Sequence, residues 1–136
     1  RRAFLLESLS GVGAAWVVAN VAGIEDAQAF VQQSAGARSV RFAFFTPAQA
    51  AEVEAMAAQI IPTDATPGAR EARVIQFIDR VLTTFEQPRQ AEYVEGLKQL
   101  QAQTAQMLPA ASRFSALTSE QQIQVLTAME KTPFFN

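Results

Sequence analysis

The chain of 136 residues contains no cysteine and no histidine. These absences remove the thiolate nucleophile, the side chain that most often acts as a general base near neutral pH, and the commonest ligand of protein-bound metals. They also exclude a disulfide framework and a covalently attached c-type haem. Little of the usual catalytic inventory is therefore left to this chain.

An excess of positive charge is absent as well. The sequence has 11 lysine and arginine residues against 13 aspartate and glutamate residues, which gives a formal net charge of -2. Such a chain cannot neutralise a phosphate backbone or an anionic membrane surface, so nucleic acid is not an expected partner. Its length suits one compact domain, because 49% of the residues are hydrophobic.

The first 29 residues have the pattern of an export signal. Two arginines open the chain, residues 8–24 carry no charge, and the small-residue motif Ala27-Gln28-Ala29 follows. An arginine pair followed by Ala-Phe-Leu resembles the twin-arginine signal, which exports folded proteins. We therefore interpret residues 1–29 as a twin-arginine signal and expect a periplasmic protein. The residues expected to carry the signal are Arg1, Arg2, Phe4 and Leu5.

Other interpretations of this segment stay open. The uncharged run is interrupted by glycines and is shorter than the roughly 20 residues that span a bilayer. The segment could instead be an ordinary buried helix of the domain. It could also be retained after export, as a membrane-associated helix or as a helix that lies against a partner protein.

The remainder of the chain is predicted to be helical. Residues 30–39 lack periodicity and indicate a linker, and Val40–Phe45 is expected to be a short extended lead-in, which places a linker and lead-in over 30–45. Apolar spacing predicts helices over about 47–61, 74–85, 90–107 and 119–129 within a domain of residues 46–136. Capping boxes begin the first and last helices at Thr46 and Thr118. The fold class is all-α, a small bundle of about four helices with an N-terminal signal helix. The apolar stripe of the first helix comprises Val53, Met56, Ala57, Ile60 and Ile61, and that of the last Ile123, Leu126 and Met129.

Three carboxylates are the candidates for chemistry. Asp64, Glu71 and Asp79 are near one another in the sequence, and a carboxylate pair can act as acid and base when its environment separates the two pKa values. Asp64 lies in a turn, where aspartate routinely bonds to its own backbone. Glu71 and Asp79 are flanked by arginines, which favours solvated ion pairs over catalysis.

Phenylalanines gather at two places. Phe42, Phe44 and Phe45 precede the first helix, and Phe134 and Phe135 lie at the end of the chain. Packing in the core is the favoured interpretation for a domain of this size. A surface that contacts another protein is the alternative, since exposed aromatic patches mark such sites.

Several motifs resemble one protein family. They are Ile60-Ile61-Pro62 with Asp64, then Pro67-Gly68-Ala69, then Phe77-Ile78-Asp79. Together with YVEGLKQL and FSALTSEQQIQVLTAMEKTPFF, they make residues 44–135 similar to the gluconate 2-dehydrogenase subunit 3 family. This family comprises the small subunits of membrane-bound, flavin-dependent sugar dehydrogenases. The family commonly has glycine where this chain has Arg73, and its usual arginine-bearing helix and glycine-rich tail are not found after Asn136.

The resemblance implies a subunit without catalytic residues, cofactor or metal of its own. In such complexes a large flavoprotein of the glucose-methanol-choline oxidoreductase type uses FAD to oxidise a sugar or sugar acid. A cytochrome c, which carries haem, or a similar carrier then takes the electrons onward. The small subunit resembles an escort, because its twin-arginine signal serves both itself and the large subunit.

The expected function is therefore binding. The loop from Pro62 to Ala69 is the first candidate for contact, because its two prolines reduce the entropy lost on docking. Two alternatives remain: a sugar-acting enzyme that uses its own carboxylates, and a stand-alone helical domain anchored to a membrane. The candidate partner-binding residues are Phe42, Phe44, Phe45, Pro62, Asp64, Pro67, Gly68, Phe134 and Phe135.

Overall fold

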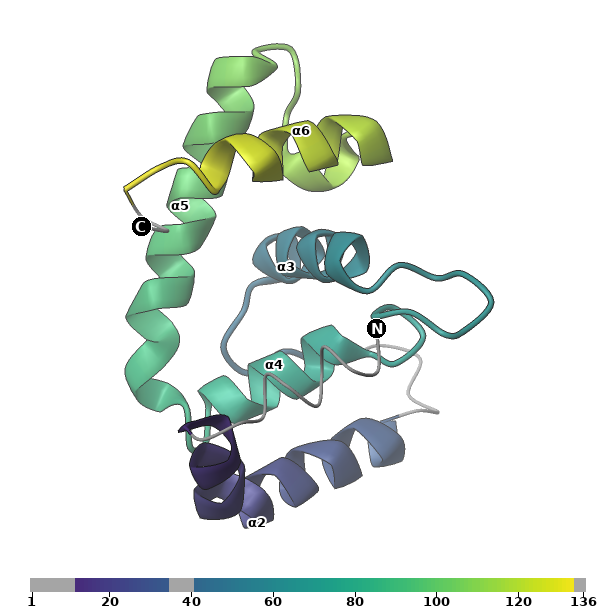
Figure 1. The fold of residues 1–136 in the computed structure, drawn as a ribbon, viewed down its shortest axis with the longest axis vertical. Helices are drawn as coiled ribbons and strands as arrows, with labels where there is room; N and C mark the ends of the chain where they lie inside the picture. Colours follow the sequence, from purple (N-terminus) through teal and green to yellow (C-terminus); the bar gives the residue numbers. More distant parts are fainter. Residues whose placement is uncertain (1–11, 35–40, 134–136) are drawn as a thin grey trace.

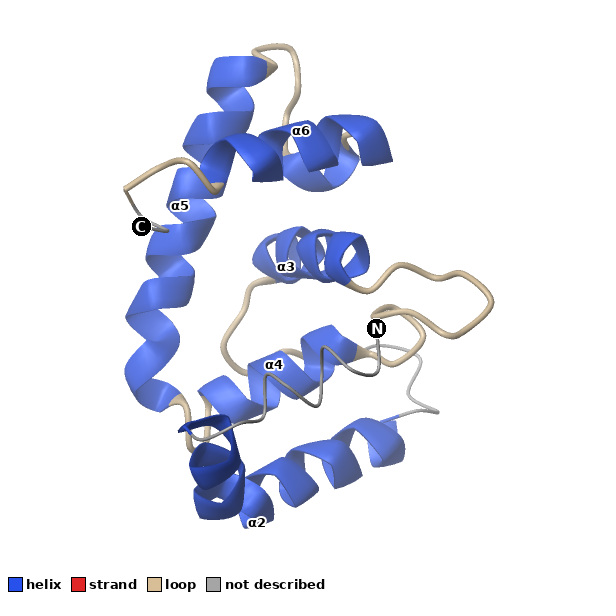
Figure 2. Ribbon diagram, viewed as in Figure 1, coloured by secondary structure: helices blue, strands red, loops and turns tan. Residues whose placement is uncertain are grey.

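The computed structural model describes residues 12–34 and 41–133. These residues form five α-helices joined by loops and by two short 3₁₀-helices, and no strand occurs among them (Figure 2). The all-α prediction is confirmed. The helices are α2 (Val12–Gln33), α3 (Pro47–Ile60), α4 (Val74–Leu82), α5 (Gln90–Met107) and α6 (Ser119–Met129), with η2 at Gln87–Arg89 and η3 at Phe114–Ala116.

The helices pack in an order different from their order in the chain. Helix α4 lies between α2 and α3, while α6 packs on α5 and on α3 (Figure 1). The long helix α5 runs along one side of this stack and also contacts α3. One face of α3 therefore meets α4, and another meets α6 and η3.

Capping boxes fix the starts of α3 and α6, as the sequence predicts. At α3, the hydroxyl of Thr46 accepts from the Gln49 amide at 3.3 Å, and the Gln49 side chain accepts from the Thr46 amide at 2.9 Å. Pro47 occupies the first turn, where its missing N–H costs nothing. Thr118 and Gln121 repeat the arrangement at α6, at 3.3 and 3.0 Å.

The core consists of two clusters that share a boundary. Met56 and Leu97 are partly buried side chains that pack against both clusters, so α3 and α5 connect them. The first cluster contains Phe45, Ala50, Val53, Ile75 and Leu82. The second contains Ala55, Leu100, Phe114, Val125 and Met129.

A buried carboxylate connects α4 to the segment that leads into α3. Asp79 is 4% exposed. One of its oxygens accepts from the amides of Phe44 and Phe45 at 3.0 and 2.9 Å, and the other accepts from the amide of Ala43 at 2.7 Å. These amides precede a helix, belong to no strand, and need an acceptor once they are buried. The prediction that Asp79 forms a solvated ion pair is therefore wrong, and its neighbour Arg80 pairs with Asp26 instead.

Helix α2 extends further than expected. The sequence predicts a linker from Phe30, but the helix continues to Gln33 and packs on α4. Phe30 lies beneath the guanidinium of Arg80, 5.4 Å from the ring centroid, and this contact favours continuation of the helix. Among the described residues, no helix has the length and apolar character needed to cross a bilayer. The division of the chain into three parts stays a prediction.

Arg73 has an unusual backbone conformation for its residue type. Its φ and ψ of 53° and 40° lie in the left-handed region, immediately before α4 begins. Across residues 12–34 and 41–133 it is the one non-glycine residue with a positive φ. Glycine adopts this conformation at no steric cost, whereas a side chain with a Cβ makes it unfavourable.

Replacing Asp79 by asparagine should destabilise the fold by about 2 kcal/mol, because an NH₂ group would face amides that now donate to a carboxylate oxygen. Urea denaturation of the purified chain measures this change. Glu130→Gln, an exchange of the same chemistry at an exposed position after α6, should stay within about 0.5 kcal/mol of the parent. Equal stability of Asp79→Asn and the parent protein would disprove the role of Asp79.

At position 73, glycine should be more stable than alanine by about 1 kcal/mol, because alanine pays the left-handed penalty and glycine does not. Both variants lack the arginine side chain, so their difference isolates the backbone term. The matched control is Ala102→Gly in the exposed interior of α5, where glycine should instead cost about 1 kcal/mol. Thermal or urea unfolding measures both stability differences, and glycine should be the more stable residue at position 73 and the less stable one at position 102.

Candidate docking surface

Large apolar side chains are exposed at four places on the described surface, one of which is Met107 at the end of α5. Ile60 and Ile61 end α3 and are 77% and 52% exposed. Ile123 lies on α6, and the first half of α2 exposes an apolar face. That face comprises Trp16, Val17, Val18 and Val21.

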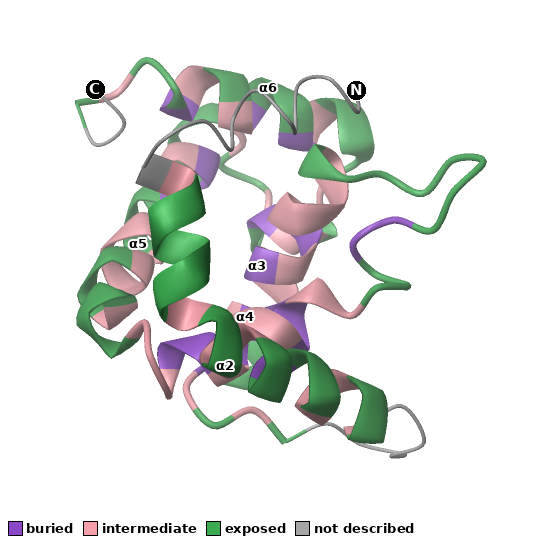
Figure 3. Cartoon of the chain, turned by 60° about the horizontal axis from the view of Figure 1, so that its bottom comes forward, coloured by how far each residue is buried: buried purple, intermediate pink, exposed green. Residues whose placement is uncertain are grey.

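The loop after Ile61 projects from the body between α3 and α4 and is exposed over residues 61–67 (Figure 3). A carboxylate closes its base. Glu71 accepts from the Thr63 hydroxyl at 2.7 Å and from the Gly68 amide at 2.9 Å, through one oxygen. The amide of Ala69 donates to the Ile61 carbonyl at 2.9 Å and joins the two ends of the loop. The base is thus fixed by hydrogen bonds of its own.

The tip of the loop is also ordered by its own side chains. Asp64 accepts from the Thr66 amide at 2.9 Å and from the Thr66 hydroxyl at 3.0 Å. The Asp64 amide donates to the Thr66 carbonyl at 3.2 Å. This confirms the prediction that Asp64 serves a turn. Pro62 and Pro67 flank this turn, and their rings restrict the backbone angle φ at both positions.

Glycine is required at position 68 because backbone atoms surround its Cα. A Cβ there would lie 2.6 Å from the Thr63 nitrogen, 2.7 Å from the Ile61 oxygen and 2.8 Å from the Pro62 carbonyl carbon. These atoms belong to the loop base and cannot move aside as a flexible side chain could. The close approach of Gly68 to the backbone of residues 61–63 therefore requires glycine.

The three candidate carboxylates serve structure in three separate ways. Asp64 orders the turn, Glu71 closes the loop, and Asp79 holds the amides before α3. The main contacts of Glu71 are hydrogen bonds from the loop, while the nearest ion pair of Arg70 is with Glu54 at 3.6 Å. Within the part of the chain that the structure describes, no group of three metal-ligating side chains gathers.

The predicted partner-binding residues within the described part of the chain differ in their burial. Phe45 belongs to the first core cluster, and Phe42 and Phe44 are half-buried against it. Of the loop residues, Pro62, Asp64 and Pro67 are exposed, whereas Gly68 is buried. The predictions for Arg1, Arg2, Phe4, Leu5, Phe134 and Phe135 fall outside the described residues.

The exposure of three isoleucines differs from the sequence prediction. Spacing assigns Ile60, Ile61 and Ile123 to apolar stripes, yet each is more than half exposed. One signal was present for the first two: they immediately precede Pro62, where the helix must end and its apolar face can turn away from the core.

A model of one protein family, described as gluconate 2-dehydrogenase subunit 3, matches residues 47–135. The chain belongs to this family. The gluconate 2-dehydrogenase subunit 3 family supplies a subunit of a dehydrogenase complex, so association with other dehydrogenase subunits is implied. A search of curated proteins and a search of solved structures each gave no match. The loop and Ile60, Ile61 and Ile123 all lie in the matched region, whereas α2 precedes it.

The loop-closing carboxylate has a perturbed acidity. The hydrogen bond from Thr63 contributes most to holding the pKa of Glu71 below its ordinary value of 4.5, and backbone amides and Arg70 act in the same direction. A native pKa below the unfolded value stabilises the fold above the unfolded pKa, and this contribution is lost as the pH falls through the native pKa.

Glu71→Gln should therefore be less stable than the parent at pH 7, and the difference should shrink as the pH falls below 4.5. Urea titrations at pH 7, 5 and 3 measure it. Thr63→Val, which removes the main donor, should weaken the same pH dependence. A difference between parent and Glu71→Gln that is independent of pH would contradict the assignment.

Proposed function

We propose that this chain is the non-catalytic small subunit of a periplasmic, FAD-dependent sugar or sugar-acid dehydrogenase. It binds the large catalytic flavoprotein, supports its folding and assembly, and accompanies it through the twin-arginine export route. The observation that carries the proposal is the self-closed loop with exposed Ile60 and Ile61 at its base, within the region that the family shares.

Two adjacent isoleucines on a fixed loop differ from scattered surface apolar residues. Single exposed apolar side chains are ordinary and need no explanation. Ile60 and Ile61 are next to each other at the end of a helix, and the hydrogen bonds of Glu71 and Ala69 hold the backbone that follows. Burial of one isoleucine against a partner contributes about 1.5–3 kcal/mol.

Pre-closure of the loop favours binding. A loop that orders only on contact would lose conformational entropy at that moment, which weakens the complex. Here the turn at Asp64, the clamp at Glu71 and the close packing at Gly68 have already ordered it. A stable complex buries about 1,200–2,000 Å² in total, so this end of α3 is the centre of a larger contact that includes neighbouring surface.

The redox chemistry belongs to the partners. FAD would be held by the catalytic subunit and haem c by a cytochrome c subunit, since a chain without cysteine offers no attachment site for c-type haem. Export by the twin-arginine route suits a flavoprotein that folds around FAD before it crosses the membrane. In this proposal Arg1, Arg2, Phe4 and Leu5 provide the signal for both proteins.

Co-expression with the large dehydrogenase subunit of the same organism tests the docking surface. Ile60→Asp with Ile61→Asp should weaken the complex by tenfold or more in Kd, because each buried isoleucine contributes more than the 1.4 kcal/mol that equals tenfold. Met107→Asp is the control, since Met107 is an exposed apolar residue at the end of α5 that lies outside both the loop and the proposed signal. If the double variant and the control variant both co-purify with the large subunit as well as the parent chain does, the interface lies elsewhere.

Export of the complex is measured in the same cells. Changing Arg1 and Arg2 to lysine should retain the complex in the cytoplasm, and flavin-dependent sugar oxidation should disappear from the periplasmic and membrane fractions. If the large subunit is exported and active with the lysine pair, the escort role is wrong. Docking and export therefore fail independently of each other.

A further inference from the structure

The small-residue motif that the sequence offers as a cleavage site lies inside a continuous helix. Ala27-Gln28-Ala29 falls within α2, which runs without interruption to Gln33. Ala27 is 0% exposed. Gln28 and Ala29 are exposed, but the backbone on both sides of the bond between Ala29 and Phe30 is helical. Because proteases cut poorly ordered chain, this helical backbone protects the bond in the folded protein.

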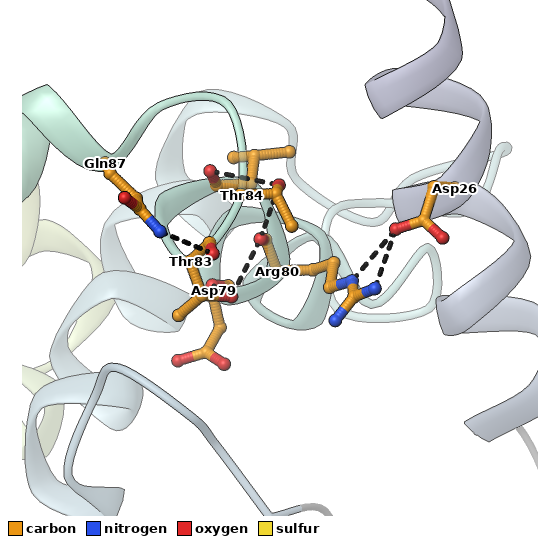
Figure 4. A network of polar contacts seen from close by, with 7 residues as sticks. Asp26, Asp79, Arg80, Thr83, Thr84 and Gln87 are labelled. Atoms are coloured by element: carbon orange, nitrogen blue, oxygen red, sulfur yellow. Dashed lines mark hydrogen bonds and ion pairs between the residues drawn. The ribbon is translucent and has the colours of Figure 1, made fainter.

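One arginine holds both sides of that bond. Arg80 donates to one oxygen of Asp26 from Nε at 3.0 Å and from Nη2 at 2.9 Å, and Figure 4 shows it reaching from α4 to α2. The same guanidinium lies 5.4 Å from the ring centroid of Phe30. Asp26 precedes the Ala29–Phe30 bond and Phe30 follows it. Cleavage would therefore separate two groups that Arg80 binds together.

The first half of α2 is attached by different contacts. The indole Nε1 of Trp16 donates to Glu86 at 3.0 Å, and its ring lies 5.9 Å from that of Phe85. Further along, a Cβ placed on Gly23 would lie 2.3 Å from Cδ1 of Phe85. The absence of a side chain at Gly23 is what allows α2 to approach this ring.

We infer that α2 is a permanent helix of the mature subunit and that the chain is not processed after Ala29. Any removal of a leader takes place before Trp16. The helix lies against α4 of its own domain, which agrees with the alternative of an ordinary helix of the domain and not with a helix held by a membrane or by a partner protein. Loss of residues up to Ala29 would uncover Phe85 and leave Arg80 without Asp26.

This inference goes beyond the proposed function and does not depend on it. It concerns the covalent state and packing of this chain alone, so failure of docking or of export leaves it unaffected. The two measurements below also need no other subunit.

The first measurement is the intact mass of the subunit purified from the periplasmic and membrane fractions after expression from its complete reading frame, because only exported chain meets a leader peptidase. A mature chain that retains Trp16 through Phe30 is expected, whether or not a leader has been removed. A chain that begins anywhere after Trp16, at Phe30 above all, would overturn the inference.

The second measurement is the direction in which one substitution shifts the melting temperature of the mature protein. Alanine is a better helix former than glycine, so Gly23→Ala would raise the melting temperature of an unattached helix or leave it unchanged. Because α2 packs on Phe85, we expect Gly23→Ala to lower it by about 4 °C or more. A second variant, Phe85→Ala, provides the matched background, in which Gly23→Ala should lose this effect. A melting temperature that rises or stays unchanged on Gly23→Ala in the parent protein would overturn the packing of α2 on Phe85.

Discussion

The carboxylate of Asp79 is the contact on which the arrangement of this molecule depends. It binds three successive amides of the chain just before α3, so it fixes the point from which α3 begins. The next residue, Arg80, points the other way and holds α2, as Figure 4 shows. Two neighbouring side chains of α4 thus place the helices on either side of it. Since α3 and α4 are fixed to each other, the ends of the loop between them are fixed too.

This architecture accounts for how a small chain with little catalytic inventory serves a dehydrogenase complex. The three candidate carboxylates are used for folding: one for helix packing, one for the loop base and one for the loop tip. The loop and the exposed isoleucines offer shape and apolar surface to other proteins. A shared family region that carries a rigid loop and exposed isoleucines suits a subunit whose role is association.

Local signals made most of the fold predictable, and tertiary contacts account for what was missed. Thr46 and Thr118 mark helix starts through neighbours three residues away, so spacing alone finds them. The burial of Asp79 depends on amides more than 30 residues distant, which no local pattern reveals. The same holds for α2, whose last turn is held by Arg80, and for Ile60, whose spacing fits a core stripe although the core ends before it. The candidate site was predictable as a loop, but its most exposed apolar residues were not.

The closed loop has a kinetic consequence. Because its hydrogen bonds form within the chain, no folding step has to precede or follow an encounter at this surface. The exposed side chains at its base, Ile60 and Ile61, are apolar, and the chain has a net charge of only -2. Long-range electrostatic attraction therefore contributes little to the encounter rate. Association would then proceed at the roughly 10⁵–10⁶ M⁻¹s⁻¹ of unsteered protein pairs and would depend weakly on salt. The lifetime of such a complex is set by dissociation, that is, by how completely the apolar contact excludes water.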